Sequence, residues 1–230
     1  MRLNQTVLCC FTLMLALPAA ATTIPGTSSI WLAGQASGTS VSGYFGSDTA
    51  PGNSPVQITI GGTSVVFTAT GSTSVDGGCF AGPDGGCYGD QSSFSPSPWS
   101  GNYNGPADAL IGIFTSGTPA LTMVGGYTGP VFGAGPDYQN PLNLGPGTYS
   151  PAIGQIFFIG SGAGETFVVP AGATGLYLAA ADSIGASTGN QGSLNVNASF
   201  TGGAVPEPSS IMLLGTGMLG VIGMARRRLS

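Results

Sequence analysis

Glycine and proline interrupt this chain too often for long helices to form. Of its 230 residues, 41 are Gly and 17 are Pro, and both residue types weaken or end regular elements. Short apolar or alternating runs lie between these interruptions, as is typical of β-strands. Because 42% of the residues are hydrophobic and only 6% are charged, the composition is not that of a disordered protein. The sequence therefore predicts a turn-rich β domain with a dry core.

Eight short runs predict the strands of this domain. In the clearest one, residues 193–200, apolar and polar residues alternate from Leu194 to Phe200, which gives one dry and one wet face. The others are residues 56–60, 64–70, 109–114, 120–124, 155–159, 165–169 and 175–180. Short strands with long loops favour an all-β, two-sheet sandwich of the jelly-roll or Greek-key type, with a barrel as the alternative.

Cationic side chains are missing from the middle of the chain. The basic residues are Arg2, Arg226, Arg227 and Arg228, and there is no His. All charged side chains of the segment 22–203 are carboxylates: Asp48, Asp76, Asp84, Asp90, Asp108, Asp137, Glu165 and Asp182. Nucleic-acid binding is excluded, because phosphate neutralisation needs Lys or Arg. Carboxylates without a counter-charge predict either bound metal cations or plain solvation.

The N-terminus has the pattern of a secretory signal peptide. Arg2 precedes an apolar run that ends at Pro18, and small residues follow up to Ala21. We expect cleavage near Ala21, which leaves residues 22–203 as one exported domain.

The C-terminal residues 204–230 form a three-part tail. The triplet Pro206-Glu207-Pro208 precedes an apolar stretch, residues 211–225, and then the three arginines. The stretch predicts a short transmembrane helix whose basic end stays in the cytoplasm. This tail resembles the PEP-CTERM sorting signal of Gram-negative bacteria; an ordinary tail anchor is the alternative. The resemblance implies export through the inner membrane, removal of the tail by an exosortase-type peptidase, and a place at the cell surface beside exopolysaccharide.

Two cysteines stay in the exported domain, Cys79 and Cys87. An oxidising compartment favours a disulfide that closes the Gly-rich loop between them. A metal thiolate site is the less favoured alternative, since the chain offers no His and no further Cys for it.

Several segments of the body, between residues 56 and 200, resemble the galactophilic, calcium-dependent lectins of bacteria. They are residues 66–71, 82–85, 108–113 and 169–178, followed by Asp182 and the run 189–196. The opening at 25–34, with Trp31, is similar to that of exported PEP-CTERM proteins with a body of this kind. The resemblance implies a β-sandwich that holds calcium and, through calcium, the hydroxyls of a sugar.

Carried onto this chain, the lectin pattern implies a specific set of calcium ligands. The side chains would be Asp182, Asn190 and Gln191, and the backbone oxygens would come from Val75 and from Ser187 or Ala186. Carboxylate, amide and carbonyl oxygens are the ligands that calcium prefers. The alternative is a polar loop of Asx turns before the last strand.

Aromatic residues in the loop after the cysteines are candidates for sugar contact. Tyr88, Trp99 and Tyr103 lie among Ser, Pro, Gly and Asn, and such rings can stack on sugars or can plug the end of the sandwich. The carboxylates Asp84, Asp90 and Asp108 are the candidates for a glycosidase pair. With no base of the His or Lys type, we expect no enzyme. We expect either a non-catalytic carbohydrate-binding module or a surface or matrix protein without a small ligand.

Overall fold

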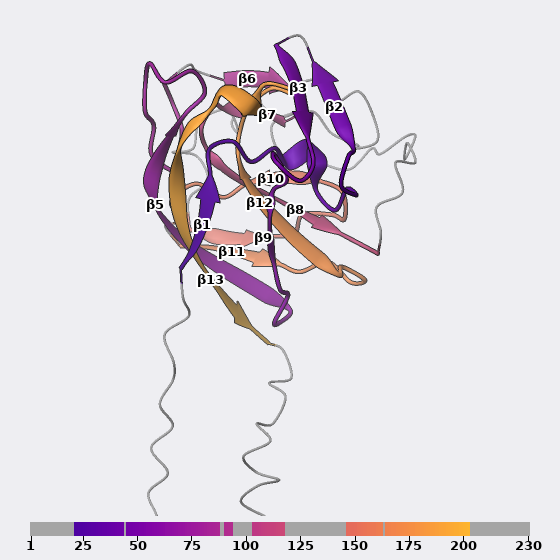
Figure 1. The fold of residues 1–230 in the computed structure, drawn as a ribbon. Coiled ribbons are helices and arrows are strands. Elements are labelled where there is room, and N and C mark those ends of the chain that lie inside the picture. Colours follow the sequence, from indigo (N-terminus) through magenta and orange to yellow (C-terminus); the bar gives the residue numbers. More distant parts are fainter. Residues whose placement is uncertain are drawn as a thin grey trace, which may run out of the picture.

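The computed structural model describes residues 21–43, 45–87, 90–93, 103–117, 146–162 and 164–202, with backbone alone for 90–93 and 103–104. Two larger sheets and two hairpins make up this part of the chain (Figure 1). Its regular elements are strands and short 3₁₀ turns.

The five-stranded sheet is built around the last strand. Its order is β1 (Thr22–Pro25), β13 (Gln191–Thr201), β5 (Ser64–Ser74), β11 (Glu165–Val168) and β9 (Gly147–Tyr149). β13 and β5 pair along their whole length, from Gln191 opposite Ser74 to Thr201 opposite Ser64. The strand that ends the described chain therefore lies between the first strand and the rest of its sheet.

The four-stranded sheet has the order β10 (Ile156–Phe158), β8 (Leu110–Thr115), β12 (Gly175–Ala180) and β4 (Val56–Ile58). All three pairings in it are antiparallel. The strand β8 is buried at every position, as expected for a strand covered on both faces.

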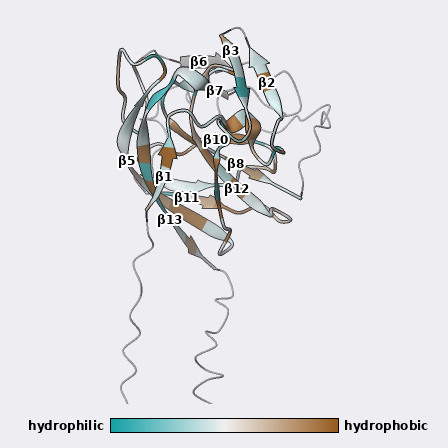
Figure 2. Ribbon diagram, viewed as in Figure 1, coloured by the Kyte–Doolittle hydropathy of each residue, from teal (hydrophilic) through white to brown (hydrophobic). Residues whose placement is uncertain are grey.

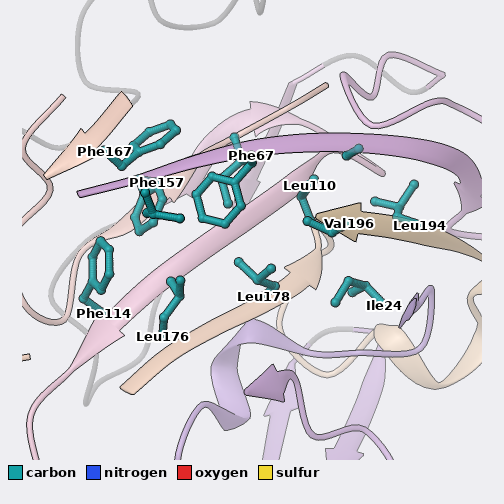
Figure 3. Close-up of a cluster of buried hydrophobic side chains, with 13 residues drawn as sticks. Ile24, Phe67, Leu110, Phe114, Phe157, Phe167, Leu176, Leu178, Leu194 and Val196 are labelled. Carbon is teal, nitrogen blue, oxygen red and sulfur yellow. The ribbon is translucent and has the colours of Figure 1, made fainter. Parts of the chain in front are cut away.

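The core lies between the two sheets. Figure 3 shows Phe67, Leu194 and Val196 of one sheet opposite Leu110, Leu176 and Leu178 of the other. Phe157 and Phe167 meet in this layer with ring centroids 5.0 Å apart, a favourable aromatic separation. Figure 2 shows the corresponding hydrophobic segments on β1, β5, β8, β12 and β13.

A second apolar cluster lies on the outer face of the four-stranded sheet. There the 3₁₀ turn η1 (Ile30–Leu32) buries Trp31 against Ile111, Ala179 and neighbouring residues. The hairpin of β2 (Ser40–Gly43) and β3 (Gly46–Thr49) extends beside η1, and a second 3₁₀ turn, η3 (Ser187–Gly189), precedes β13. A further hairpin joins β6 (Asp90–Ser93) to β7 (Tyr103–Pro106).

The predicted all-β fold is confirmed, with the core of a sandwich-like arrangement. The expected runs at 56–60, 64–70, 109–114, 155–159, 165–169, 175–180 and 193–200 coincide with β4, β5, β8, β10, β11, β12 and β13. The run at 120–124 lies outside the described residues.

The predicted signal peptide, before residue 21, and the predicted transmembrane helix 211–225 both lie outside the described residues. Across the described residues, no helix combines the length and apolar character that a bilayer crossing needs.

Candidate functional site

Two buried carboxylates, Asp108 and Asp182, lie near each other at one end of the four-stranded sheet. Asp108 precedes β8 and Asp182 follows β12, and the register of these strands places Ala180 opposite Leu110. Two backbone hydrogen bonds lie just beyond that pairing, from Asp108 N to Ala181 O at 2.9 Å and from Ala181 N to Ala109 O at 2.7 Å. Asp108 and Ala109 thus both bond to Ala181, which is the pattern of a β-bulge at the start of β8. Asp182 is the next residue after Ala181, and its charge acts on Asp108.

Both carboxylates are also buried, which makes their negative charges costly. Asp108 is 0% exposed and Asp182 is 9% exposed. Burial, with the charges of Asp182 and Asp76 as smaller contributions, raises the pKa of Asp108 to about 7. Burial raises the pKa of Asp182 to about 6; its hydrogen bonds from Ser183 and Asn190 oppose this shift and the charge of Asp48 adds to it. The raised pKa values mean that the surrounding protein groups do not fully stabilise the negative charges of Asp108 and Asp182.

The backbone at Asp108 is held in an uncommon conformation. Its φ is 68°, the one positive value among the described residues other than Gly. The Thr73 hydroxyl donates to the Asp108 carbonyl at 3.0 Å, whereas neither carboxylate oxygen of Asp108 has a hydrogen-bond partner among the described residues. A strained residue with an unsatisfied buried side chain is typical of a functional position.

Residues from the N-terminal segment hold Asp182 in place. The Trp31 indole Nε1–H donates to the Asp182 backbone carbonyl at 3.2 Å across 151 residues of sequence. The Asp182 side chain accepts a hydrogen bond from the Ser183 N–H. The tryptophan of the opening segment therefore fixes the end of β12 from the outer face of the sheet.

Asn190 approaches the same carboxylate from the start of β13. Its Nδ2 donates to the Gly26 carbonyl at 3.1 Å, and its side chain also forms a hydrogen bond with Asp182. Asn190 is 6% exposed, and its Oδ1 has no hydrogen-bond partner within the described part of the chain. A buried amide oxygen next to a carboxylate provides two neighbouring oxygen ligands for a hard cation.

The other predicted ligands lie around this pair. The backbone oxygen of Ser187 accepts the Asn190 N–H at 3.1 Å, which leaves one lone pair on that carbonyl. The side-chain amide of Gln191 lies against Gly77, where a Cβ would be 2.4 Å from Nε2. Val75 leads into the same turn, directly after β5. The structure thus brings Asp182 and Asn190 into contact and places Gln191 over the turn that follows Val75.

Asp48 is a site residue that the sequence interpretation missed. It lies in β3 and is 0% exposed, and its Oδ1 accepts from the Thr188 N–H at 3.2 Å. Its Oδ2 has no hydrogen-bond partner among the described residues, and its charge acts on Asp182. The Ser- and Thr-rich sequence around Asp48 gives no sign that this carboxylate is buried. Its role becomes visible only from the position of the hairpin beside η3.

Within the described residues, no three His, Cys, Asp or Glu side chains come together as a metal-binding group. Asp182 and Asn190 would therefore be the contacting side chains, while Asp48 and Asp108 surround them with negative charge. Oxygen is the shared ligand type, as calcium requires.

The remaining candidates have different outcomes. The predicted disulfide is confirmed between Cys79 and Cys87. Tyr88 and Trp99 lie outside the described residues, and only the backbone of Tyr103 is described, in β7. Asp84 accepts the Ser161 N–H at 2.7 Å, and the side chain of Asp90 is not described. The carboxylates whose charges act on Asp108 are Asp182 and Asp76, and neither was expected to form a glycosidase pair with it.

Comparison with known families identifies the PEP-CTERM protein-sorting motif at residues 204–228. The matched segment includes the expected triplet Pro206, Glu207 and Pro208. No curated protein matches the chain. The motif is that of an exported protein, anchored in the membrane before exosortase processing and then released to the cell surface.

Proposed function

We propose that the exported domain binds calcium at Asp182 and Asn190 and uses this site to hold a surface glycan without altering it chemically. One observation carries the proposal: Asp108 and Asp182 are both buried, the charge of Asp182 acts on Asp108, and the segment 22–203 has no cationic side chain. Their charges need either protons or a cation for compensation. At neutral pH a divalent cation compensates both.

The available ligands favour calcium over other metals. Asp182 and Asn190 present carboxylate and amide oxygens. The Ser187 carbonyl lies in the turn before Asn190, and Val75 follows Ser74, which pairs with Gln191. Zinc and copper prefer His or thiolate ligands, but this chain has no His and Cys79 and Cys87 are joined to each other. Calcium, when bound, would supply open coordination positions for neighbouring sugar hydroxyls.

The protein's own groups prepare this site. Trp31 fixes the Asp182 backbone, and the Gly26 carbonyl orients the Asn190 amide, whose oxygen has no donor among the described residues. Asp48 and Asp108 add negative charge nearby, which raises the affinity for a cation. Resemblance of residues 56–200 to galactophilic lectins and the surface destination of the chain support a glycan as the partner.

The same chemistry supports a non-catalytic role for the domain. Glycoside hydrolysis needs an accessible pair of carboxyl groups on either side of the bond, and Asp108 is 0% exposed. The competing candidate is a surface or matrix protein with no small ligand.

Thermal melting of the mature, released protein tests the calcium site. We expect calcium at about 100 times its dissociation constant to add roughly 2.7 kcal/mol to the free energy of unfolding. The midpoint then rises by several degrees, at about 2–4 °C per kcal/mol. Asp182→Asn should abolish this rise, while Asp84→Asn, which changes an exposed carboxylate, should keep it.

Retention on galactose-coupled resin, with and without EDTA, tests the glycan. No midpoint shift in millimolar calcium would contradict the metal site. If the protein shows neither retention on the resin nor a midpoint shift in calcium, a surface protein without a small ligand becomes the better interpretation.

A further inference from the structure

The hydroxyl of Thr188, in the 3₁₀ turn η3, lies close to three oxygen atoms from the segment around β3. Its Oγ1 is 3.2 Å from the Ser47 carbonyl oxygen, 3.4 Å from Asp48 Oδ1 and 3.3 Å from Asn53 Oδ1. A threonine hydroxyl carries one proton and donates to one acceptor at a time. All three distances also exceed the about 2.7–2.8 Å that is usual for an O–H···O hydrogen bond. The hydroxyl therefore satisfies one of these oxygens and leaves two facing it without a shared proton.

Asp48 adds a buried charge to this group of oxygens. It is 0% exposed, and its Oδ1 accepts the Thr188 N–H at 3.2 Å. Its Oδ2 is buried and has no hydrogen-bond partner among the described residues. Since every charged side chain between residues 22 and 203 is a carboxylate, no side-chain cation of this segment neutralises Asp48. Buried carboxylates are normally paired with an opposite charge or coordinated to a metal.

The amide of Asn53 is oriented so that its oxygen faces Thr188. Its Nδ2 donates to the Thr27 carbonyl at 3.0 Å, and its Oδ1 accepts the Thr49 N–H at 3.1 Å. Asn53 is 9% exposed, so protein groups hold this side chain in one position. A fixed amide oxygen beside a carboxylate is a suitable ligand for a hard cation.

The spacing of these oxygens fits calcium. Calcium binds oxygen at about 2.3–2.6 Å, so two ligands at right angles to each other are roughly 3.3–3.7 Å apart, whereas magnesium ligands at about 2.0–2.1 Å are roughly 2.9 Å apart. The three contacts of Thr188 Oγ1, at 3.2, 3.4 and 3.3 Å, lie closer to the calcium value. Waters complete the shell where the protein supplies fewer than six oxygens.

The surroundings hold the ligands in place and leave a path from solvent. Backbone packs on backbone where the hairpin meets the loop after β12, because a Cβ added at Gly43 would overlap the Ile184 carbonyl and one at Gly185 would overlap the Gly46 carbonyl. Thr188 is itself exposed. A cation can therefore reach Asp48 from the Thr188 side without any movement of the hairpin.

We propose a second calcium site at the junction of β3 and η3, separate from the site at Asp182 and Asn190. Its protein ligands are the Ser47 carbonyl, the Asp48 carboxylate, the Asn53 amide oxygen and the Thr188 hydroxyl. The cation neutralises Asp48, occupies the position toward which these oxygens converge, and connects the β2–β3 hairpin to the turn before β13. No ligand is shared with the first site, so the second does not require it.

The two sites should fill in sequence. Asp182 interacts with the charges of both Asp48 and Asp108, which makes it the stronger attractor for a cation. Because the charge of Asp48 reaches Asp182, a cation bound at one carboxylate weakens the attraction of the other for a second cation. The site at Asp48 therefore fills at calcium concentrations above those that saturate the site at Asp182.

Calorimetric titration of the mature, released protein with calcium counts the sites. We expect two equivalents in the parent, the weaker of which is lost in Asp48→Asn, a change that keeps an acceptor oxygen for the Thr188 N–H. Asp182→Asn should keep the equivalent at Asp48. Thr188→Val should weaken that equivalent about tenfold or more, whereas Thr188→Ser, which keeps the hydroxyl, should bind as the parent does. Asp84→Asn, which changes an exposed carboxylate, is the matched control and should keep both equivalents.

The outcomes separate this inference from the proposed function. Two equivalents of unchanged affinity in Asp48→Asn or Thr188→Val would overturn the second site. A single equivalent that is lost in Asp182→Asn would also overturn it: if Asp48→Asn keeps this equivalent, calcium binds at Asp182 alone, and if Asp48→Asn loses it too, both carboxylates share one cation. A single equivalent that is lost in Asp48→Asn and kept in Asp182→Asn would support the second site and contradict the first. A parent that binds no calcium overturns both sites.

Discussion

At the scale of the residue, Asp108 determines how the metal-free domain responds to pH. Its pKa is raised from 3.8 to about 7, so between these pH values the folded state holds a proton that the unfolded chain has released. The free energy of unfolding must therefore fall as pH rises from about 4 to about 7. The stabilisation is fully present below about pH 4 and is lost above about pH 7.

Replacement by Asn tests this dependence without changing shape. Asn also tolerates a positive φ, so Asp108→Asn should fold and should melt higher than the parent at pH 8 in EDTA. The two midpoints should converge near pH 4. Melts at several pH values measure this, with Asp84→Asn as the control that follows the parent. A difference between the midpoints of Asp108→Asn and the parent that is the same at every pH would contradict the raised pKa of Asp108.

Trp31 gives a second prediction at this scale. Trp31→Phe removes the donor to the Asp182 carbonyl and leaves that buried acceptor with one partner fewer. We expect a loss of about 1–3 kcal/mol in the free energy of unfolding together with weaker calcium binding. Phe167→Leu, in the main core, should destabilise the domain and leave calcium affinity unchanged. Calorimetry of calcium binding to both variants distinguishes local from global effects.

The sequence predicts part of the site at this scale and misses the rest for a clear reason. Asp182 and Asn190 are close in sequence and both come from the lectin resemblance. Asp108 and Asp182 are 74 positions apart, and their proximity depends on β8 and β12 being neighbours, with Ala180 opposite Leu110. Both strands are predictable from their apolar runs, but nothing in either run encodes the partner or the register.

At the scale of the element, the β2–β3 hairpin is stabilised mainly by polar contacts. The Ser40 and Thr49 hydroxyls lie 2.8 Å apart, and those of Ser42 and Ser47 lie 2.7 Å apart. Hydrophobic alternation is the main sequence signal for a strand, and this hairpin has almost none. The long apolar strands β5 and β13 were predictable, whereas this hairpin, which frames the site, was not.

Asp48 links the hairpin to η3 and gives the prediction for this element. Asp48→Ala removes the acceptor of the Thr188 N–H and should lower the free energy of unfolding by about 1–3 kcal/mol. The amides of residues 184–190 should then exchange faster with solvent. Asp48→Asn retains an acceptor oxygen and should keep slow exchange. Equal exchange in both variants would contradict the linking role.

At the scale of the whole molecule, the disulfide supports a loop that is also held by other contacts. Ala81 pairs with Thr73, the Pro83 carbonyl accepts the Leu110 N–H at 2.8 Å, and Asp84 accepts from Ser161. Because the closed loop is short, with a sequence separation of 8, reduction should cost roughly 2–3 kcal/mol at most. We expect a lower urea midpoint in reductant, but a folded domain.

The variant in which both Cys79 and Cys87 are replaced by Ser is the control for that experiment. With or without reductant, this variant should unfold at the same urea concentration as the parent does in reductant. Complete unfolding of the reduced protein in the absence of urea would contradict this account.

The place of β13 in its sheet has a consequence for export. β1 and β5 are not neighbours and meet only through β13, which ends at Thr201, just before the sorting motif at 204–228. During translocation the early strands emerge first and must wait for the strand that joins them. The sheet can close only when nearly the whole domain has crossed, at the moment when the tail reaches the bilayer. We therefore expect the sheet to be completed at the stage when the sorting motif reaches the membrane, before the tail is removed.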